Sequence, residues 1–212
     1  MACLCRRDPD MEVILDSQFD FSPQVTKVVQ SCFYQIRNIA KIKHFISQSD
    51  LEKVIHALVS TRLDYCNALY AGLGLKLLSR LQLVQNSAAR LLTGTKKHEH
   101  ITPILASLHW LPVNFRIDFK ILLITFKALH GVAPTYICDM LSPYVPGRCL
   151  HSSGQSLLTV PPSRLLTRGD RAFSVRAPKL WNSLPEELRA ANTVSTFKAK
   201  LKTYLYRMAF LL

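Results

Sequence analysis

Apolar residues recur at spacings of three and four along much of this chain, which is the pattern of helices that bury one face. In the first such segment, for example, Val25, Val29, Cys32, Ile36 and Ile39 fall on one side of a helix. The pattern predicts a mainly α fold, a bundle of about five helices. The predicted helices span residues 21–43, 47–70, 75–94, 114–130 and 195–210.

Capping residues predict where several of these helices begin and end. Ser22 is a candidate N-cap before a proline, and Ser49 with Glu52 has the spacing of a capping box. Asn114 is a candidate cap for the fourth helix. Gly94 suits the left-handed position that ends a helix.

Two regions depart from the helical pattern. Residues 13–15 form a short apolar run that predicts a β-strand remnant. Residues 144–180 are basic and interrupted by proline and glycine, so they predict an irregular segment before the C-terminal helix. The chain therefore divides into a divergent N-terminus with the strand (1–20), a thumb-like helical domain (21–143), the irregular segment (144–180) and a C-terminal helical segment (181–212).

The amino-acid composition indicates that the predicted helical bundle is a basic protein. Hydrophobic residues make up 49% of the 212 residues, which argues against disorder. The formal net charge is +13, and such an excess points to a polyanionic partner. No window of about 18 apolar residues occurs, so we expect no membrane span and favour nucleic acid. The six cysteines include no C-x-x-C pair, and we find no signal peptide, so we expect an intracellular protein of the cytoplasm or nucleus.

Catalytic patterns are missing from the sequence. It has no glycine-rich phosphate loop, and His98 and His100 are too close for an H-E-x-x-H zinc motif. Cys66 has no indicated base, so we expect a small core residue there. We therefore predict no catalytic residue, metal, cofactor or small-molecule substrate.

One cationic stripe interrupts the most apolar helix. At about 100° per residue, Arg116, Lys120, Lys127 and His130 share a narrow face, whereas Asp118 lies on the opposite side. Two interpretations stay open. The stripe is either a solvated face whose long stems cover apolar neighbours, or a surface that follows a phosphate backbone.

A second helix repeats this arrangement with Lys76, Arg80 and Arg90. Nearby aromatic residues offer stacking surfaces for bases, although Trp110 is better explained as a core residue. With two lysines of the following loop, the candidate nucleic-acid-binding residues are Lys76, Arg80, Arg90, Lys96, Lys97, Arg116, Lys120 and Lys127.

Several long segments resemble one family. They are "RLDYCNALYAGL", "RLQLVQNSAARLLTG", "HITPILASLHWLPVNFRIDFKILLITFKALHGVAPTYI" and "APKLWNSLPEELRAANTVSTFKAKLKTYLY". They are similar to the C-terminal end of reverse transcriptases of LINE-type, non-LTR retrotransposons. The resemblance implies a chain that leaves the catalytic palm near residue 13 and continues as the thumb and C-terminal extension.

The resemblance also implies what is missing. The family's polymerase chemistry needs paired metal-binding aspartates, and no Asp-Asp pair occurs in this sequence. The endonuclease domain is absent too. Cys149 and His151 stand where the family often has more basic residues, which weakens the case for phosphate binding by that loop.

The sequence thus leads to a hypothesis with two alternatives. The chain is expected to be a non-catalytic reverse-transcriptase fragment that binds RNA or an RNA–DNA hybrid through cationic helix faces. It is otherwise a protein–protein interaction module whose exposed apolar helix faces bind a partner, or a translated retroelement remnant with no selected function.

Overall fold

The computed structural model describes residues 13–145, 156–165 and 168–210, and this part of the chain is mainly helical, as predicted. The strand predicted at residues 13–15 is wrong, because these residues are extended but form no ladder. The Ile14 amide instead donates a hydrogen bond of 2.9 Å to Gln24 Oε1. In the described ranges, pairing between extended segments is limited to one isolated bridge between Pro143 and Leu158.

The long helices are those that the hydrophobic pattern predicts, with short helices between them. The N-terminal half contains α1 (Ser22–Ile42), α2 (Gln48–Ile55), the π-helical turn η1 (His56–Ser60), α3 (Thr61–Asp64), the 3-10 turn η2 (Asn67–Tyr70), α4 (Leu75–Thr93) and α5 (Ile101–Ser107). The rest contains α6 (Val113–Leu129), α7 (Thr135–Cys138), the 3-10 turn η4 (Gly169–Arg171), α8 (Phe173–Asn182), α9 (Glu186–Arg189) and α10 (Val194–Phe210).

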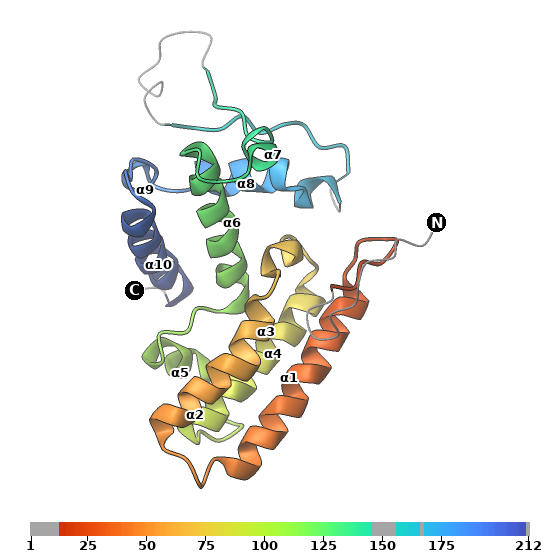
Figure 1. Cartoon of the computed structure of the whole chain (residues 1–212), viewed down its shortest axis with the longest axis vertical. Coiled ribbons are helices and arrows are strands. Elements are labelled where there is room, and N and C mark those ends of the chain that lie inside the picture. The colour runs from red at the N-terminus through yellow and green to blue at the C-terminus, as the bar shows by residue number, and fades with distance from the viewer. Residues whose placement is uncertain (1–12, 146–155, 166–167, 211–212) are drawn as a thin grey trace.

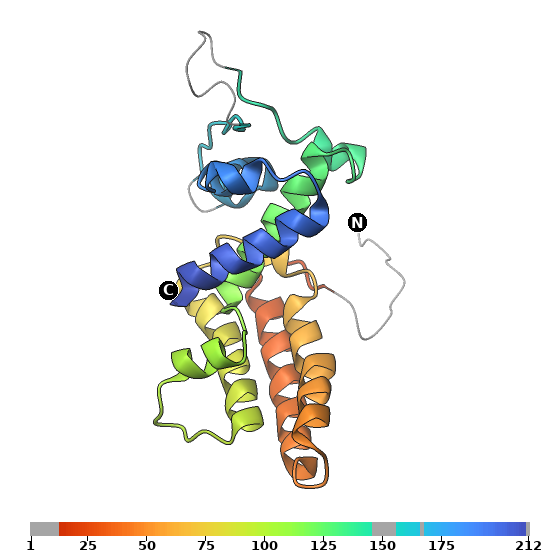
Figure 2. The same ribbon diagram turned by 90° about the vertical axis from the view of Figure 1, so that its left-hand side faces the viewer.

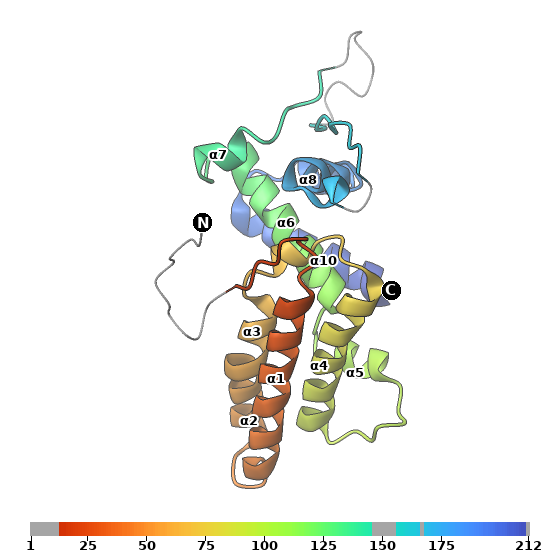
Figure 3. The same ribbon diagram turned by 90° about the vertical axis from the view of Figure 1, so that its right-hand side faces the viewer.

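The N-terminal helices form a bundle in which α1 packs along α4, and the run from α2 to α3 packs beside both (Figure 3). Val25, Cys32 and Ile39 of α1 are fully buried there, as their spacing predicts. The second predicted helix is not uniform, because a π-helical turn interrupts it at His56–Ser60. This turn still buries Val59. The second helix also ends earlier than predicted, at Asp64, where Tyr65 is extended and Cys66 left-handed.

Helix α6 joins this bundle to the C-terminal elements (Figure 1). Helix α10 crosses α6 obliquely (Figure 2), and α8 packs against α6 as well. The contact is aromatic: the rings of Phe126 and Phe197 stack with centroids 4.3 Å apart, and Trp181 lies 5.8 Å from Phe197. Burying aromatic rings of this size dominates the energetics of such contacts.

Three predicted caps are wrong. Helix α6 has Pro112 rather than Asn114 at its N-cap, and the Val113 amide donates to the Gln82 side chain instead. The N-cap of α1 is Phe21, in the left-handed conformation, because the Asp20 carboxylate accepts the hydrogen bond from the Ser22 amide. Helix α2 begins earlier than predicted, and its N-cap is Ser47, whose hydroxyl accepts from the Asp50 amide. The predicted glycine stop is confirmed, since Gly94 ends α4 with φ +71°.

The segment predicted as irregular, residues 144–180, contains most of α8. Pro178 lies inside this helix and predicted a break, yet it is buried together with Ala177 and Trp181 of the same helix. The packing of α8 on α6 thus compensates for the backbone hydrogen bond that Pro178, which has no N–H group, cannot donate. Residues 146–155, with Cys149 and His151, and residues 166–167 lie outside the described part of the chain.

Candidate nucleic-acid interface

A cleft of about 360 Å³ lies where α6, α10 and the segment before α6 meet. Four cations line it: Arg116 and Lys120 of α6, and Lys198 and Lys202 of α10. Asp64 is the one carboxylate among the residues described around it. We call this feature the cationic cleft. The remaining lining residues are His56, Asn67, His109, Trp110, Leu111 and Phe119.

Two glutamine side chains of α4 set the position of the α6 end of the cleft. Gln85 of α4 is fully buried and donates a hydrogen bond of 2.8 Å to the Leu111 carbonyl. Gln82 accepts one of 2.8 Å from the Val113 amide, which is an unpaired donor at the helix N-terminus. The side chains of Gln85 and Gln82 therefore hold the start of α6 in place. They also fix the first turn of this helix, which carries Arg116.

Arg116 is not a freely solvated cation of the stripe. Its Nε donates a hydrogen bond of 2.9 Å to Asp64 Oδ1, and a second guanidinium nitrogen contacts Oδ2 of the same carboxylate. Only 19% of the Arg116 side chain is exposed. The interpretation of the stripe as a solvated face is therefore wrong for Arg116, because its charge is paired with Asp64. The interpretation as a surface that follows a phosphate backbone stays a prediction.

The three lysines of the cleft have no such partner. Lys120, Lys198 and Lys202 are exposed, and none forms an ion pair with another described residue. Lys198 and Lys202 are one helical turn apart and follow Phe197 and Leu201, whose side chains are fully buried. Burial of these two apolar residues is thus what turns both lysines toward α6.

Aromatic and imidazole rings form the far wall of the cleft. Trp110 is only 5% exposed, which confirms that it belongs to the core, and its ring lies 5.2 Å from that of His56. His109 has a left-handed backbone, with φ +54°, and its exposed ring lies 5.5 Å from the Tyr206 ring. A left-handed non-glycine residue carries a conformational cost, so the surrounding contacts hold His109 at the rim.

The structure brings together only two of the eight predicted binding residues, Arg116 and Lys120. None of the other six lines the cationic cleft: Lys76, Arg80, Arg90, Lys96, Lys97 and Lys127. Arg90 instead donates a hydrogen bond of 3.0 Å to the Glu99 carbonyl and so holds the loop after α4. Lys198 and Lys202 were missed, although their spacing of four residues beside buried apolar positions was the available signal.

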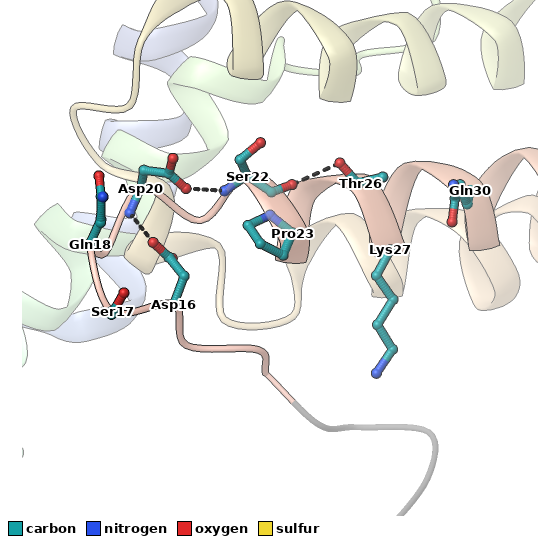
Figure 4. A pocket seen from close by; sticks show the side chains of 9 residues that line it. All are labelled: Asp16, Ser17, Gln18, Asp20, Ser22, Pro23, Thr26, Lys27 and Gln30. Carbon is teal, nitrogen blue, oxygen red and sulfur yellow. Dashed lines mark hydrogen bonds between the residues drawn. The ribbon is translucent and has the colours of Figure 1, made fainter.

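A wider hollow at the start of α1 is not a comparable site (Figure 4). Its two carboxylates serve the backbone: Asp16 accepts from the Asp20 and Phe21 amides, and Asp20 accepts from the Ser22 amide. The backbone hydrogen bond from Asp20 lowers the pKa of Asp16 below its ordinary value. The carboxylates of this hollow therefore complete the turn that enters α1.

Other expectations concern cysteines, metals and membranes. Cys66 is exposed, with φ +51°, so its predicted place in the core is wrong. Among the cysteines that the structure describes, Cys32 is the buried one, and burial raises its pKa to about 11. Within the described ranges, His, Cys, Asp and Glu side chains form no cluster that could hold a metal ion. In those ranges no helix has the length and apolar character needed to cross a membrane.

Comparison with known proteins finds no matching family model, curated protein or solved structure.

Proposed function

We propose that this protein binds the sugar-phosphate backbone of RNA or of an RNA–DNA hybrid in the cationic cleft. The observation that carries this proposal is the meeting of Lys120 with Lys198 and Lys202, which form no ion pair with any residue that the structure describes. Like charges that converge on one cleft repel each other, so their proximity is stabilised when a polyanion occupies it. The net charge of +13 adds a favourable long-range field.

The proposed role is non-catalytic and resembles that of a polymerase thumb, which grips a nucleic acid by its backbone. Backbone contacts fix position without reading sequence, and single strands add stacking on aromatic or imidazole rings. The exposed ring of His109 at the rim of the cleft supports the second contribution. The resemblance to the thumb region of LINE-type reverse transcriptases supports the same function.

The test is a titration of a single-stranded RNA at several salt concentrations. In the variant Lys120→Gln, Lys198→Gln, Lys202→Gln, the slope of log K against log salt should flatten by roughly 2, because each lost phosphate contact contributes about 0.7. The loss should be similar for RNAs of different sequence.

A control variant loses the same number of positive charges, but from positions outside the cleft. Lys27, Lys41 and Lys200 are exposed and lie outside the cleft, so their replacement by Gln also removes three charges. The control should retain most of the salt slope. An equal loss in both variants would show that binding follows overall charge, which would contradict a role for the cleft.

A further inference from the structure

A second hollow, of about 450 Å³, lies between the loop before α1, η2, α6 and the start of α8. It shares no lining residue with the cationic cleft. Its lining is largely apolar and includes Phe19, Phe21, Leu69, Ile121 and Phe173. Phe19 and Leu69 remain 54% and 41% exposed, so these apolar surfaces are open to solvent.

The charged groups that line this hollow are three arginines, Arg168, Arg171 and Arg176. From outside the lining, Asp118 contacts Arg176, and Asp16 and Asp20 interact electrostatically with Arg171. We call the hollow the arginine pocket. Arg171 is held rigidly: it donates hydrogen bonds to the Phe19 carbonyl (2.8 Å) and the Ala71 carbonyl (3.2 Å). Its guanidinium carbon also lies 5.5 Å from the centre of the Phe21 ring.

The other two arginines keep unused donors. Arg176 contacts Asp118 at 3.3 Å through one terminal nitrogen, while its buried Nε has no hydrogen-bond partner among the described residues. The Arg168 side chain is exposed and forms no ion pair within the described ranges. The pocket therefore combines apolar walls with guanidinium groups whose hydrogen-bonding capacity is incompletely used.

We propose that the arginine pocket binds a small organic anion with an apolar body, of the alkyl or aryl carboxylate class. A guanidinium fork matches a carboxylate, and the apolar walls would gain from covering a hydrocarbon body. A neutral hydrocarbon would leave the arginine donors unused, and a bare phosphate would leave Phe19 and Leu69 in water. The volume lies in the range of small-molecule sites.

Calorimetric titration of the full chain with decanoate, decanol and inorganic phosphate tests the ligand class. Decanoate should bind at least about tenfold more tightly than either decanol or phosphate, because only decanoate satisfies both parts of the pocket. Equal affinity for decanol would show a merely apolar surface. Equal affinity for phosphate would show a general anion site. Either result overturns the proposal.

Three variants locate the binding. Arg168→Gln should weaken decanoate binding about fivefold and Leu69→Asp about tenfold or more, because the first removes a charged donor and the second places a carboxylate against the ligand. The control Arg164→Gln removes an exposed arginine that does not line the pocket, and should leave the affinity unchanged. Circular dichroism confirms that each variant is folded. Unchanged affinity in both pocket variants, or the same loss in Arg164→Gln, contradicts the assignment.

Discussion

Arg116 Nε donates a hydrogen bond of 2.9 Å to Asp64 Oδ1, which joins the first turn of α6 to the end of α3 across 52 residues of sequence. The pair occupies the wall of the cationic cleft and leaves the three lysines as its unneutralised charges. Asp64 is 43% exposed, so an incoming phosphate would lie close to a carboxylate as well as to cations. If the cleft binds RNA as proposed, the pair should therefore weaken its attraction for the phosphate backbone.

Replacing Asp64 by Asn should increase RNA affinity at low salt by about threefold to tenfold, since it removes one repulsive charge and frees Arg116 to contact phosphate. The salt slope should steepen by about 0.7. Thermal or urea unfolding should show a stability loss on the order of 1 kcal/mol for the partly exposed pair. RNA affinity that falls with the fold intact would show that Asp64 supports binding by orienting Arg116.

Replacing Phe197 by Ala should destabilise the protein by about 3–5 kcal/mol, because this residue is fully buried between Phe126 and Trp181. Urea unfolding measures the loss. Because α10 also carries Lys198 and Lys202, RNA binding should weaken in the same variant under native conditions. The control Met208→Ala changes an exposed residue of the same helix and should cost less than about 0.5 kcal/mol. A similar cost for both would contradict the packing of α10 on α6.

Cys32 should resist thiol reagents at pH 8. Its pKa of about 11 lies above the ordinary 9.0, so only roughly 0.1% of it is thiolate at that pH, and its side chain is also buried. Cys66 is exposed and should be labelled in the native state. Peptide mass spectrometry after labelling distinguishes the two sites. Labelling of Cys32 should appear only with unfolding by urea, and equal labelling of both cysteines in native protein would contradict the packing of α1.

The isolated chain should not extend a primer on an RNA template with Mg²⁺ or Mn²⁺, because the sequence has no Asp-Asp pair to hold two catalytic metals. Incorporation of labelled nucleotide measures this. A control purified in the same way, with Lys120, Lys198 and Lys202 changed to Gln, detects a contaminating polymerase. Incorporation by the natural chain that is lost in the control would contradict the proposed non-catalytic role.

Local sequence pattern predicts much of the fold. The positions of the long helices follow from apolar spacing, and the end of α4 follows from Gly94, since both signals act within a few residues of the chain. The caps at Ser22 and Ser49 were misplaced because Asp20 and Ser47, just upstream, provide the better-placed oxygens. Helix α8 was missed because its packing against α6, which is distant in the chain, has no local signature.

The candidate site also has some features that local sequence predicts and others that depend on contacts between distant parts of the chain. The excess of positive charge, the mainly α fold and the helix face shared by Arg116 and Lys120 can be read from the chain, because they depend on composition and helical period alone. The pairing of Asp64 with Arg116, and the meeting of Lys198 and Lys202 with Lys120, follow instead from how the helices pack. Helix α10 is placed by the burial of Phe197 against Phe126, a contact between residues far apart in the chain. A one-dimensional pattern shows which face of each helix is apolar, but not which apolar faces pack together.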